Sequence, residues 1–363
     1  MMNALERRST FALSSIFALR MLGLFMIIPV FSVAGQSYQY STPALIGLAV
    51  GVYGLTQAIL QIPFSLIADR YSRKPLVVFG LLLFALGGAI AAMSDTIYGV
   101  IIGRAIAGGG AVSAVVMALL ADVTREENRM KAMAVMGMSI GMSFVVAFSL
   151  GPWLTGWVGI SGLFWVTTVM GLAAILMLLL VPKVTRHHRN FQQGYITQLK
   201  QVLKMGDLNR LHVSVFTLHL LLTAMFIYVP SQLIQFADIP LQHHGWVYLP
   251  LLLVSLFVAF PSIVLAEKYR KMRGIFLTAI AGIILGLLVL IFGFESKYIL
   301  LLGLGLFFIA FNVMEALLPS WLSKAAPIQS KATAMGVNAS SQFLGAFFGG
   351  MIGGQLLMLN HTA

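Results

Sequence analysis

The sequence contains no cysteine and very few charged residues. Only 9% of its 363 residues are charged, 59% are hydrophobic and the mean hydropathy is +0.94, whereas soluble domains carry about 25% charge. The absence of cysteine excludes disulfides, thiolate nucleophiles and cysteine-based zinc or iron–sulfur sites. The shortage of charge excludes a soluble globular domain, because too few charged side chains remain to cover a water-exposed surface of this size.

Long apolar runs take the place of the missing charge. Because these runs are continuous and about 20 residues long, they match membrane-spanning helices and disfavour a β-barrel, whose short strands alternate in polarity. The sequence therefore predicts an all-α polytopic membrane protein. The eleven expected spans are 11–34, 44–68, 76–94, 97–122, 132–155, 160–181, 211–235, 246–266, 274–294, 298–322 and 332–358.

The longest polar break divides these spans into six and five. We therefore expect an N-terminal six-helix bundle at 1–181, a basic linker at 182–210 and a C-terminal bundle of five helices at 211–363. The two halves resemble each other, since LIADRY at 66–71 corresponds to VLAEKY at 264–269. Parallel repeats of this kind are typical of secondary transporters. A twelfth helix would complete the second repeat, and we interpret its absence as a truncation of the chain.

Basic residues gather in alternate loops. Of the 23 Lys and Arg residues, 20 lie in the N-terminal tail and in the loops after the second, fourth, sixth, eighth and tenth spans. The positive-inside rule then predicts that the N-terminus and these loops are cytoplasmic. Because the basic residues are dispersed over six short segments, nucleic acid is excluded as a partner.

Three charged residues and one histidine lie within the expected spans, namely Arg20, Arg104, Glu315 and His219. They fall in helices 1, 4, 10 and 7, the first helix of each three-helix unit, and charge in lipid is costly, so we expect them to face a central polar cavity. Burial favours the neutral form of a carboxyl group, so Glu315 is the first candidate for proton coupling and His219 the second. The alternatives are an ion pair of Glu315 with either arginine, and a bond from His219 to a backbone carbonyl. Arg20 is a candidate for binding an anion, with a structural salt bridge as the alternative.

Uncharged polar residues also lie deep in the expected spans, namely Gln57, Gln61, Asn312, Asn338 and Gln342. The first two share a face of the second helix, and the last two share a face of the eleventh. Together with the two arginines, these five are candidates for lining the substrate cavity. The alternative is that they pin helices to one another through hydrogen bonds.

Local patterns predict helix contacts and one helix start. Gly47 with Gly51, and Gly137 with Gly141, have the spacing that permits close contact between membrane helices. The pattern from Thr124 to Glu127 matches a capping box ahead of the fifth span.

The loop at 69–75 carries a compact pattern of charge. Asp69, Arg70 and Arg73 lie close together in the chain, and we expect them to form a network with Asp122 at the end of the fourth span. Such a network can latch one conformation. The alternative is positive-inside topology alone, which explains the basic residues but not the aspartate.

These residues resemble motifs of the major facilitator superfamily. The run Asp69-Arg70-x-Ser72-Arg73-Lys74 is similar to the family's signature between helices 2 and 3, and Arg104 is similar to its helix-4 arginine. The resemblance implies two parallel, pseudo-symmetric six-helix halves that work by alternating access. It also implies that Asp69, Arg73 and Asp122 form a charge relay that stabilises the outward-facing state.

The fifth expected span resembles the helix-5 motif of the family's drug–proton antiporters. Gly151-Pro152 and Gly156 carry this likeness, whereas Ala147 and Thr155 stand where the motif has glycines. Likewise, serines stand in place of two glycines of the loop signature, at Ser65 and Ser72.

The expected function follows from these residues together. The glycine run at 108–110 lies within a span and is not followed by a Gly-Lys-Ser/Thr sequence, so no ATP site is expected and a proton gradient is the expected energy source, without cofactor or metal. We expect a monomeric, non-enzymatic transporter of the bacterial inner membrane that exports small amphipathic molecules in exchange for protons, in contact with lipid. The alternatives are a proton symporter importing a small nutrient, and a membrane binding or sensor protein that does not transport.

Overall fold

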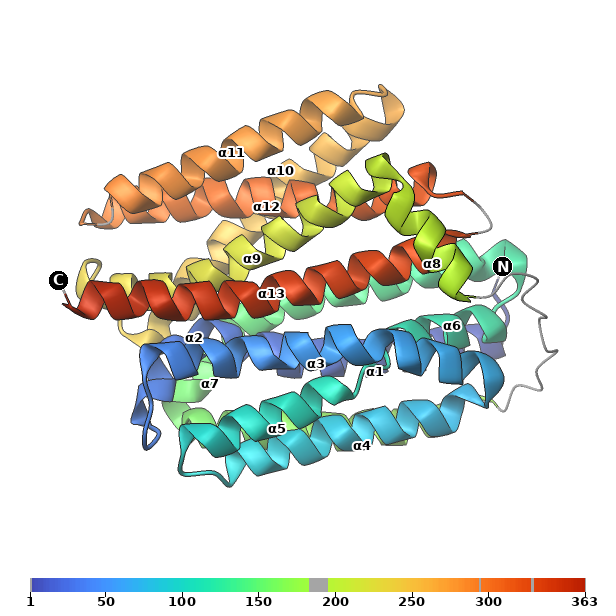
Figure 1. Cartoon of the computed structure of the whole chain (residues 1–363), viewed down its shortest axis with the longest axis horizontal. Helices are drawn as coiled ribbons and strands as arrows, with labels where there is room; N and C mark the ends of the chain where they lie inside the picture. The colour runs from blue at the N-terminus through green and yellow to red at the C-terminus, as the bar shows by residue number, and fades with distance from the viewer. Residues whose placement is uncertain (1, 183–194, 294, 328–329, 363) are drawn as a thin grey trace.

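A computed structural model describes residues 2–182, 195–293, 295–327 and 330–362 of the chain, and this part is helical throughout, with one isolated bridge between Gln39 and Thr96 (Figure 1). The all-α prediction is confirmed. The helices are α1 (Ala4–Phe25), α2 (Ile28–Ala34), α3 (Pro43–Arg70), α4 (Arg73–Ala92), α5 (Ile97–Gly109), α6 (Ser113–Val123), α7 (Glu126–Met177), α8 (Tyr195–Lys204), α9 (Gly206–Gln235), α10 (His244–Lys268), α11 (Met272–Phe292), α12 (Lys297–Ala325) and α13 (Lys331–Thr362).

Helix α7 joins the expected spans 132–155 and 160–181 in one assigned element. Gly159 has φ +66, a left-handed conformation that glycine adopts without a steric penalty. Ser143 donates to the carbonyl of Ala18 and Thr167 donates to the carbonyl of Gly23, both on α1. Residues 24 positions apart thus meet the same short stretch of α1, so the chain doubles back near Gly159.

Two other expected spans are each built from two helices. The first is divided between α1 and α2, where Pro29 lies in the first turn of α2 and favours a helix start. The fourth is divided between α5 and α6 at Gly110–Val112, which do not have helical geometry. Counting α7 once, ten segments of the described chain are long and apolar enough to cross a membrane, and each of the eleven expected spans overlaps one of them over most of its length.

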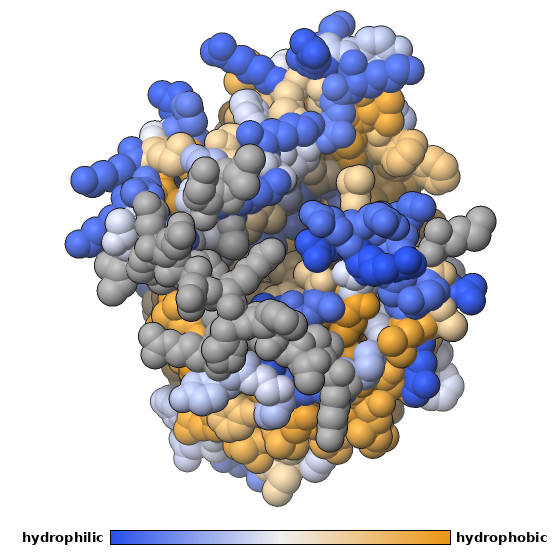
Figure 2. Space-filling view, turned by 90° about the vertical axis from the view of Figure 1, so that its right-hand side faces the viewer, coloured by the Kyte–Doolittle hydropathy of each residue, from blue (hydrophilic) through white to orange (hydrophobic). Residues whose placement is uncertain are grey.

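The helices form two groups joined by α13. Figure 1 shows α1–α7 in one group and α9–α12 in the other, with α13 lying along both α3 and α9. We call the end that holds the N-terminus, α8 and the α3–α4, α6–α7, α10–α11 and α12–α13 connections the basic end, and the other the far end. Figure 2 looks at the basic end, where hydrophilic side chains gather.

The contact between α3 and α13 depends on glycine. A Cβ atom on Gly47 would collide with the carbonyl of Gly350, and one on Gly51 would lie 2.7 Å from the carbonyl of Phe347. The close contact expected of the first glycine pair is therefore confirmed. The expectation for Gly137 and Gly141 is wrong, because a Cβ at either position would have no atom within 4 Å.

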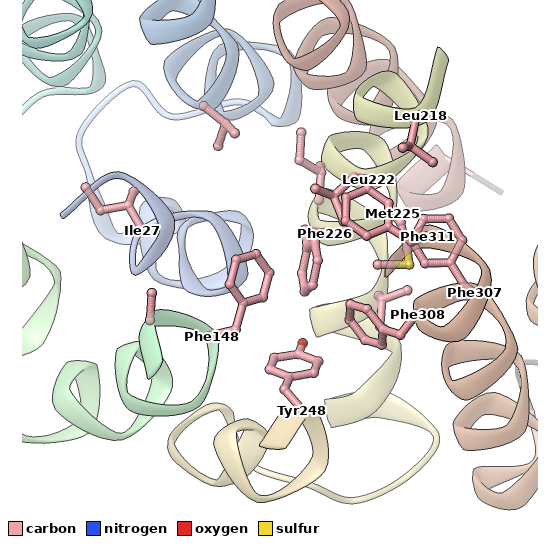
Figure 3. Packing of buried hydrophobic residues seen from close by; sticks show 14 of the residues in the cluster. Ile27, Phe148, Leu218, Leu222, Met225, Phe226, Tyr248, Phe307, Phe308 and Phe311 are labelled. Atoms are coloured by element: carbon pink, nitrogen blue, oxygen red, sulfur yellow. The ribbon is translucent and has the colours of Figure 1, made fainter. Parts of the chain in front are cut away.

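Aromatic residues close the two groups against each other toward the far end. The ring of Phe148 on α7 lies 4.4 Å from that of Phe226 on α9, and both rings contact Tyr248 on α10 (Figure 3). Ser32 on α2 also donates to the carbonyl of Phe226. Toward the basic end, in contrast, Gly137, Gly141 and Gly336 on α7 and α13 face open space. The described contacts that join α2 and α7 to α9 and α10 thus lie toward the far end, and these three glycines toward the basic end have none.

Candidate functional site

The candidate site lies where α9, α12 and α13 meet. His219 on α9 is 92% buried, and its Nε2 lies 2.7 Å from the amide nitrogen of Gln342 on α13 and 3.6 Å from Oε2 of Glu315 on α12. The Glu315 side chain is 39% exposed, so this carboxyl group reaches open space while the imidazole does not. The structure thus brings together three of the residues expected from the sequence.

The hydrogen bonds of His219 define its neutral tautomer. Nδ1 lies 3.0 Å from the carbonyl oxygen of Val215, one turn earlier, and a carbonyl can only accept. Nδ1 therefore carries the proton, and Nε2 of the neutral ring accepts from the Gln342 amide. The ring of Phe311 packs edge-on against the imidazole at a centroid distance of 5.9 Å. The backbone bond that the sequence offered as an alternative for His219 is present together with the approach to Glu315.

Two other polar residues of the expected cavity lie near this site. Asn312 on α12 donates to the hydroxyl of Ser255 on α10 and to the carbonyl of Phe308. Asn338 on α13 is 7% exposed, and its Oδ1 has no hydrogen-bond partner among the described residues. The contact of Asn312 with Ser255 joins neighbouring helices, which is the pinning role that the sequence left open, and a role of either residue in substrate binding stays a prediction.

Arg20 is the centre of a buried network in the first group of helices. Its guanidinium donates to the hydroxyls of Ser113 and Tyr53 and to Oε1 of Gln57, and Gln57 in turn donates to Gln61 at 3.2 Å. Arg20, Gln57 and Gln61 are each at most 2% exposed. The network joins α1, α3 and α6, so these three expected cavity residues hold helices together in this conformation. Their contact with substrate stays a prediction.

Arg104 also forms its hydrogen bonds within the first group of helices. Its guanidinium donates to the carbonyls of Ala49 and Val50 on α3, and it lies 5.7 Å from the centre of the Tyr53 ring. No ion pair joins Glu315 to either arginine among the described residues, where its ion-pair partner is His219. The contacts of Arg104 fix α5 against α3.

One contact of the expected charge relay is present, and its role as a relay stays a prediction. Arg73 at the start of α4 donates to Asp122 near the end of α6 at 2.6 Å. Asp69 and Arg70 are the last residues of α3, and their side chains lie outside the described residues. A related pair occupies the second group, where Lys324 and Ser320 on α12 both donate to Glu267 on α10. Each group thus has a charged link between helices at the basic end.

The sequence reasoning missed a cluster around Glu6. This carboxylate is 2% exposed and accepts from Arg125 through its backbone and guanidinium, from the Asn128 amide and from the backbone of Asn3, at 2.9–3.1 Å. Asn3 and Glu6 form a capping box at the start of α1. The spacing of an Asn and a Glu three residues later was the signal that could have revealed it.

The capping box expected at Thr124 is wrong. The hydroxyl of Thr124 donates back to the carbonyl of Leu120, and α7 begins after Arg125, which makes no side-chain cap. Within the described ranges, no three His, Asp or Glu side chains are grouped so as to hold a metal ion.

The fold is a bundle of apolar helices long enough to cross a membrane, with polar side chains buried inside it. The family model of the Major Facilitator Superfamily matches residues 13–350. The chain therefore belongs to the Major Facilitator Superfamily, whose members are transporters and not enzymes.

Relatives with known names agree with this family. The chain is 45% identical over 351 residues to the inner membrane transport protein YajR of Escherichia coli, covering 96% of this chain and 77% of that protein. It is 25% identical to multidrug resistance protein 1 of Bacillus subtilis, covering 96% of this chain and 89% of that protein.

Solved structures show the same fold. A bacterial homologue of the human lysosomal transporter Spinster, in an inward-facing and unoccupied conformation, matches with a TM-score of 0.79 at 15% identity, covering 97% of this chain and 82% of that one. A D-xylose–proton symporter matches with a TM-score of 0.74 at 16% identity, covering 94% and 88%.

Proposed function

We propose that the protein is a proton-coupled exporter of small amphipathic molecules in the bacterial inner membrane, with Glu315 and His219 as the proton-coupling pair. The observation that carries this proposal is the approach of the two groups, 3.6 Å apart, at the meeting of α9, α12 and α13. An intramembrane carboxyl group beside an imidazole can gain and lose a proton at moderate cost, because each neutral form avoids a buried charge. No ATP site is needed for such a mechanism.

The direction of transport is inferred from the relatives. Multidrug resistance proteins from Bacillus subtilis and Proteus mirabilis are 25–26% identical to this chain over 82–89% of their length. The E. coli relative at 45% identity is an inner membrane protein. Export across the inner membrane, with the basic end in the cytoplasm, is therefore the reading that we favour over nutrient import.

The arrangement of the helices supports alternating access. The contacts of α2 and α7 with α9 and α10 lie toward the far end, and we infer that the basic end is the open one, so substrate would reach Glu315 from the cytoplasm in this state. Protonation and deprotonation of the pair would then favour different packings of α9 against α12 and α13. The Arg73–Asp122 link, with Asp69 and Arg70 as further expected members, would hold one of these packings at the basic end.

Reconstituted protein provides the test. Proteoliposomes that are more acidic inside than outside should accumulate a fluorescent amphipathic cation such as ethidium in exchange for protons. Collapse of the gradient by a protonophore should abolish the uptake. Glu315→Gln should abolish coupled movement while leaving substrate exchange at equal pH. The matched control is Glu295→Gln, an exposed carboxylate between α11 and α12, which should behave as the wild type. Coupled transport that survives Glu315→Gln would refute the coupling assignment, and uptake with the opposite gradient would favour the symporter.

A further inference from the structure

We propose that Gln342 is a positioning residue that holds His219 in its neutral form, and that protonation of His219 exchanges this partner for Glu315. The inference deepens the proposed function, on which it rests. It assigns to an amide on α13 the control of when the coupling pair takes up its proton.

The first step is the chemistry of the two ring nitrogens. Because Nδ1 donates to the Val215 carbonyl, Nε2 is the position that changes on protonation. In the neutral ring Nε2 has a lone pair that can accept a hydrogen bond. The amide nitrogen of Gln342 donates to it at a distance of 2.7 Å. Once Nε2 carries a proton, two N–H groups point at each other and this contact becomes repulsive. In the orientation that the amide has here, with its nitrogen toward Nε2, the hydrogen bond from Gln342 therefore stabilises the neutral ring alone, and protonation of the ring favours either a turn of the amide or a move to another acceptor.

The second step is the alternative partner. Glu315 Oε2 lies 3.6 Å from the same Nε2, too far for a good hydrogen bond but within reach of a small movement of either side chain. A proton delivered to Nε2 from solvent gives an N–H that donates to the Glu315 carboxylate, a charge-assisted bond of the stronger kind. The pair then changes from one net negative charge to none, and the partner of α9 changes from α13 to α12.

The other neighbours of α9 do not compete for this role. Helix α2 has no titratable side chain, and the facing residues on α13 and α12 besides the pair are the neutral Gln342 and Phe311. Lys200 and Lys204 of α8 precede α9, whose first residue lies about 20 Å from His219 along the helix axis. His243, in the short helix Leu241–His243, lies at the far end. Glu315 is thus the charged side chain beside the imidazole among the described residues.

The consequence for the fold is a change in which helices are tied together. Helix α13 also carries the glycine contact with α3, across the two groups. Release of Gln342 from His219 removes one hydrogen bond between α13 and α9, which remain packed at Gly345 and Gly349, while the new bond ties α9 to α12 within the second group. Proton uptake thereby changes which neighbouring helix the imidazole is bonded to.

The test measures the histidine itself and needs no substrate. Full-length protein labelled with ¹⁵N-histidine is placed in phospholipid nanodiscs and titrated with acid, and the His219 signal is assigned by its loss in His219→Gln. At high pH the signal should be that of a ring protonated at Nδ1. In Gln342→Met, which is close to glutamine in size, the midpoint of the titration should rise by roughly half a unit to one unit, the equivalent of one hydrogen bond.

A second variant and a control make the result specific. Gln342→Glu offers an acceptor to the protonated ring, so it should raise the midpoint further than Gln342→Met. Ser340→Ala, on the same helix, removes a hydrogen bond to Ala58 and should leave the midpoint unchanged. Equal midpoints in the wild type and in both Gln342 variants, or a ring protonated at Nε2 at high pH, would overturn the proposal. If the midpoints move as expected while transport proves independent of protons, the positioning role stands and the proposed function fails.

Discussion

At the scale of single residues, Glu6 shows how one carboxylate can tie distant segments together. It joins the first turn of α1 to the connection between α6 and α7, through donors 119 and 122 positions away in the chain. Replacing the carboxylate by an amide turns one of its two acceptor oxygens into a donor, so the groups that donate to that oxygen lose their partner and the others lose a charged one. Glu6→Gln should therefore lower the midpoint of thermal unfolding in detergent by several degrees, because bonds to a charged acceptor are the stronger ones. Glu126→Gln, an exposed carboxylate at the start of α7, should leave the midpoint unchanged, and an equal loss in both variants would contradict the role of the cluster.

The sequence indicates which residues belong to the site, but it does not indicate which residues they contact. Charge inside an apolar run is visible in composition, which is why Arg20, Arg104, His219 and Glu315 stand out. Their contacts depend on helices far away in the chain, as with the 93 positions between Arg20 and Ser113. No periodicity encodes such a pairing, because it is fixed by how whole helices pack.

At the scale of helices, the glycine contact between α3 and α13 predicts that alanine lowers the unfolding midpoint at one glycine and not at another. Gly47→Ala places a methyl group against the Gly350 carbonyl and should lower the unfolding midpoint, because the two backbones must separate. Gly137→Ala points a methyl group into open space and should hold or slightly raise the midpoint, since alanine favours a helix more than glycine does. A fall of the same size in both variants would show that helix contact is not the cause.

The helix boundaries were predicted where hydropathy decides them and missed where local geometry does. Each of the eleven expected spans overlaps a helix over most of its length, but the reversal at Gly159 and the interruption after Gly109 follow from backbone conformation within apolar sequence. The capping box at Thr124 failed because a threonine hydroxyl can bond the preceding turn as readily as it caps the next helix.

At the scale of the whole molecule, the distribution of basic residues predicts which end faces the cytoplasm. The chain has no cysteine, so a single introduced cysteine is the only thiol present. Glu295→Cys at the far end should react with a membrane-impermeant maleimide in intact cells, and Lys204→Cys at the basic end only after lysis. The reverse pattern would contradict the orientation on which export depends.

Which end is closed could not be read from the sequence. The same residues must support both packings of an alternating-access protein, so composition and motifs describe the two states equally. The aromatic contacts of Phe148, Phe226 and Tyr248 and the empty surroundings of Gly137 identify the state described here, and both arise from the mutual position of the two groups.

The glycine contact between α3 and α13 also affects how easily the molecule can move. Most helix pairs in a protein interior interlock through side chains, which must disengage before the pair can tilt. Here backbone lies directly on backbone, at Gly47 and Gly350, with no side chains meshed between them. Because no side chains interdigitate at these glycines, we expect a tilt of one helix against the other to cost little packing energy. The close contact of α3 with α13 is therefore well suited to a tilt of one helix against the other.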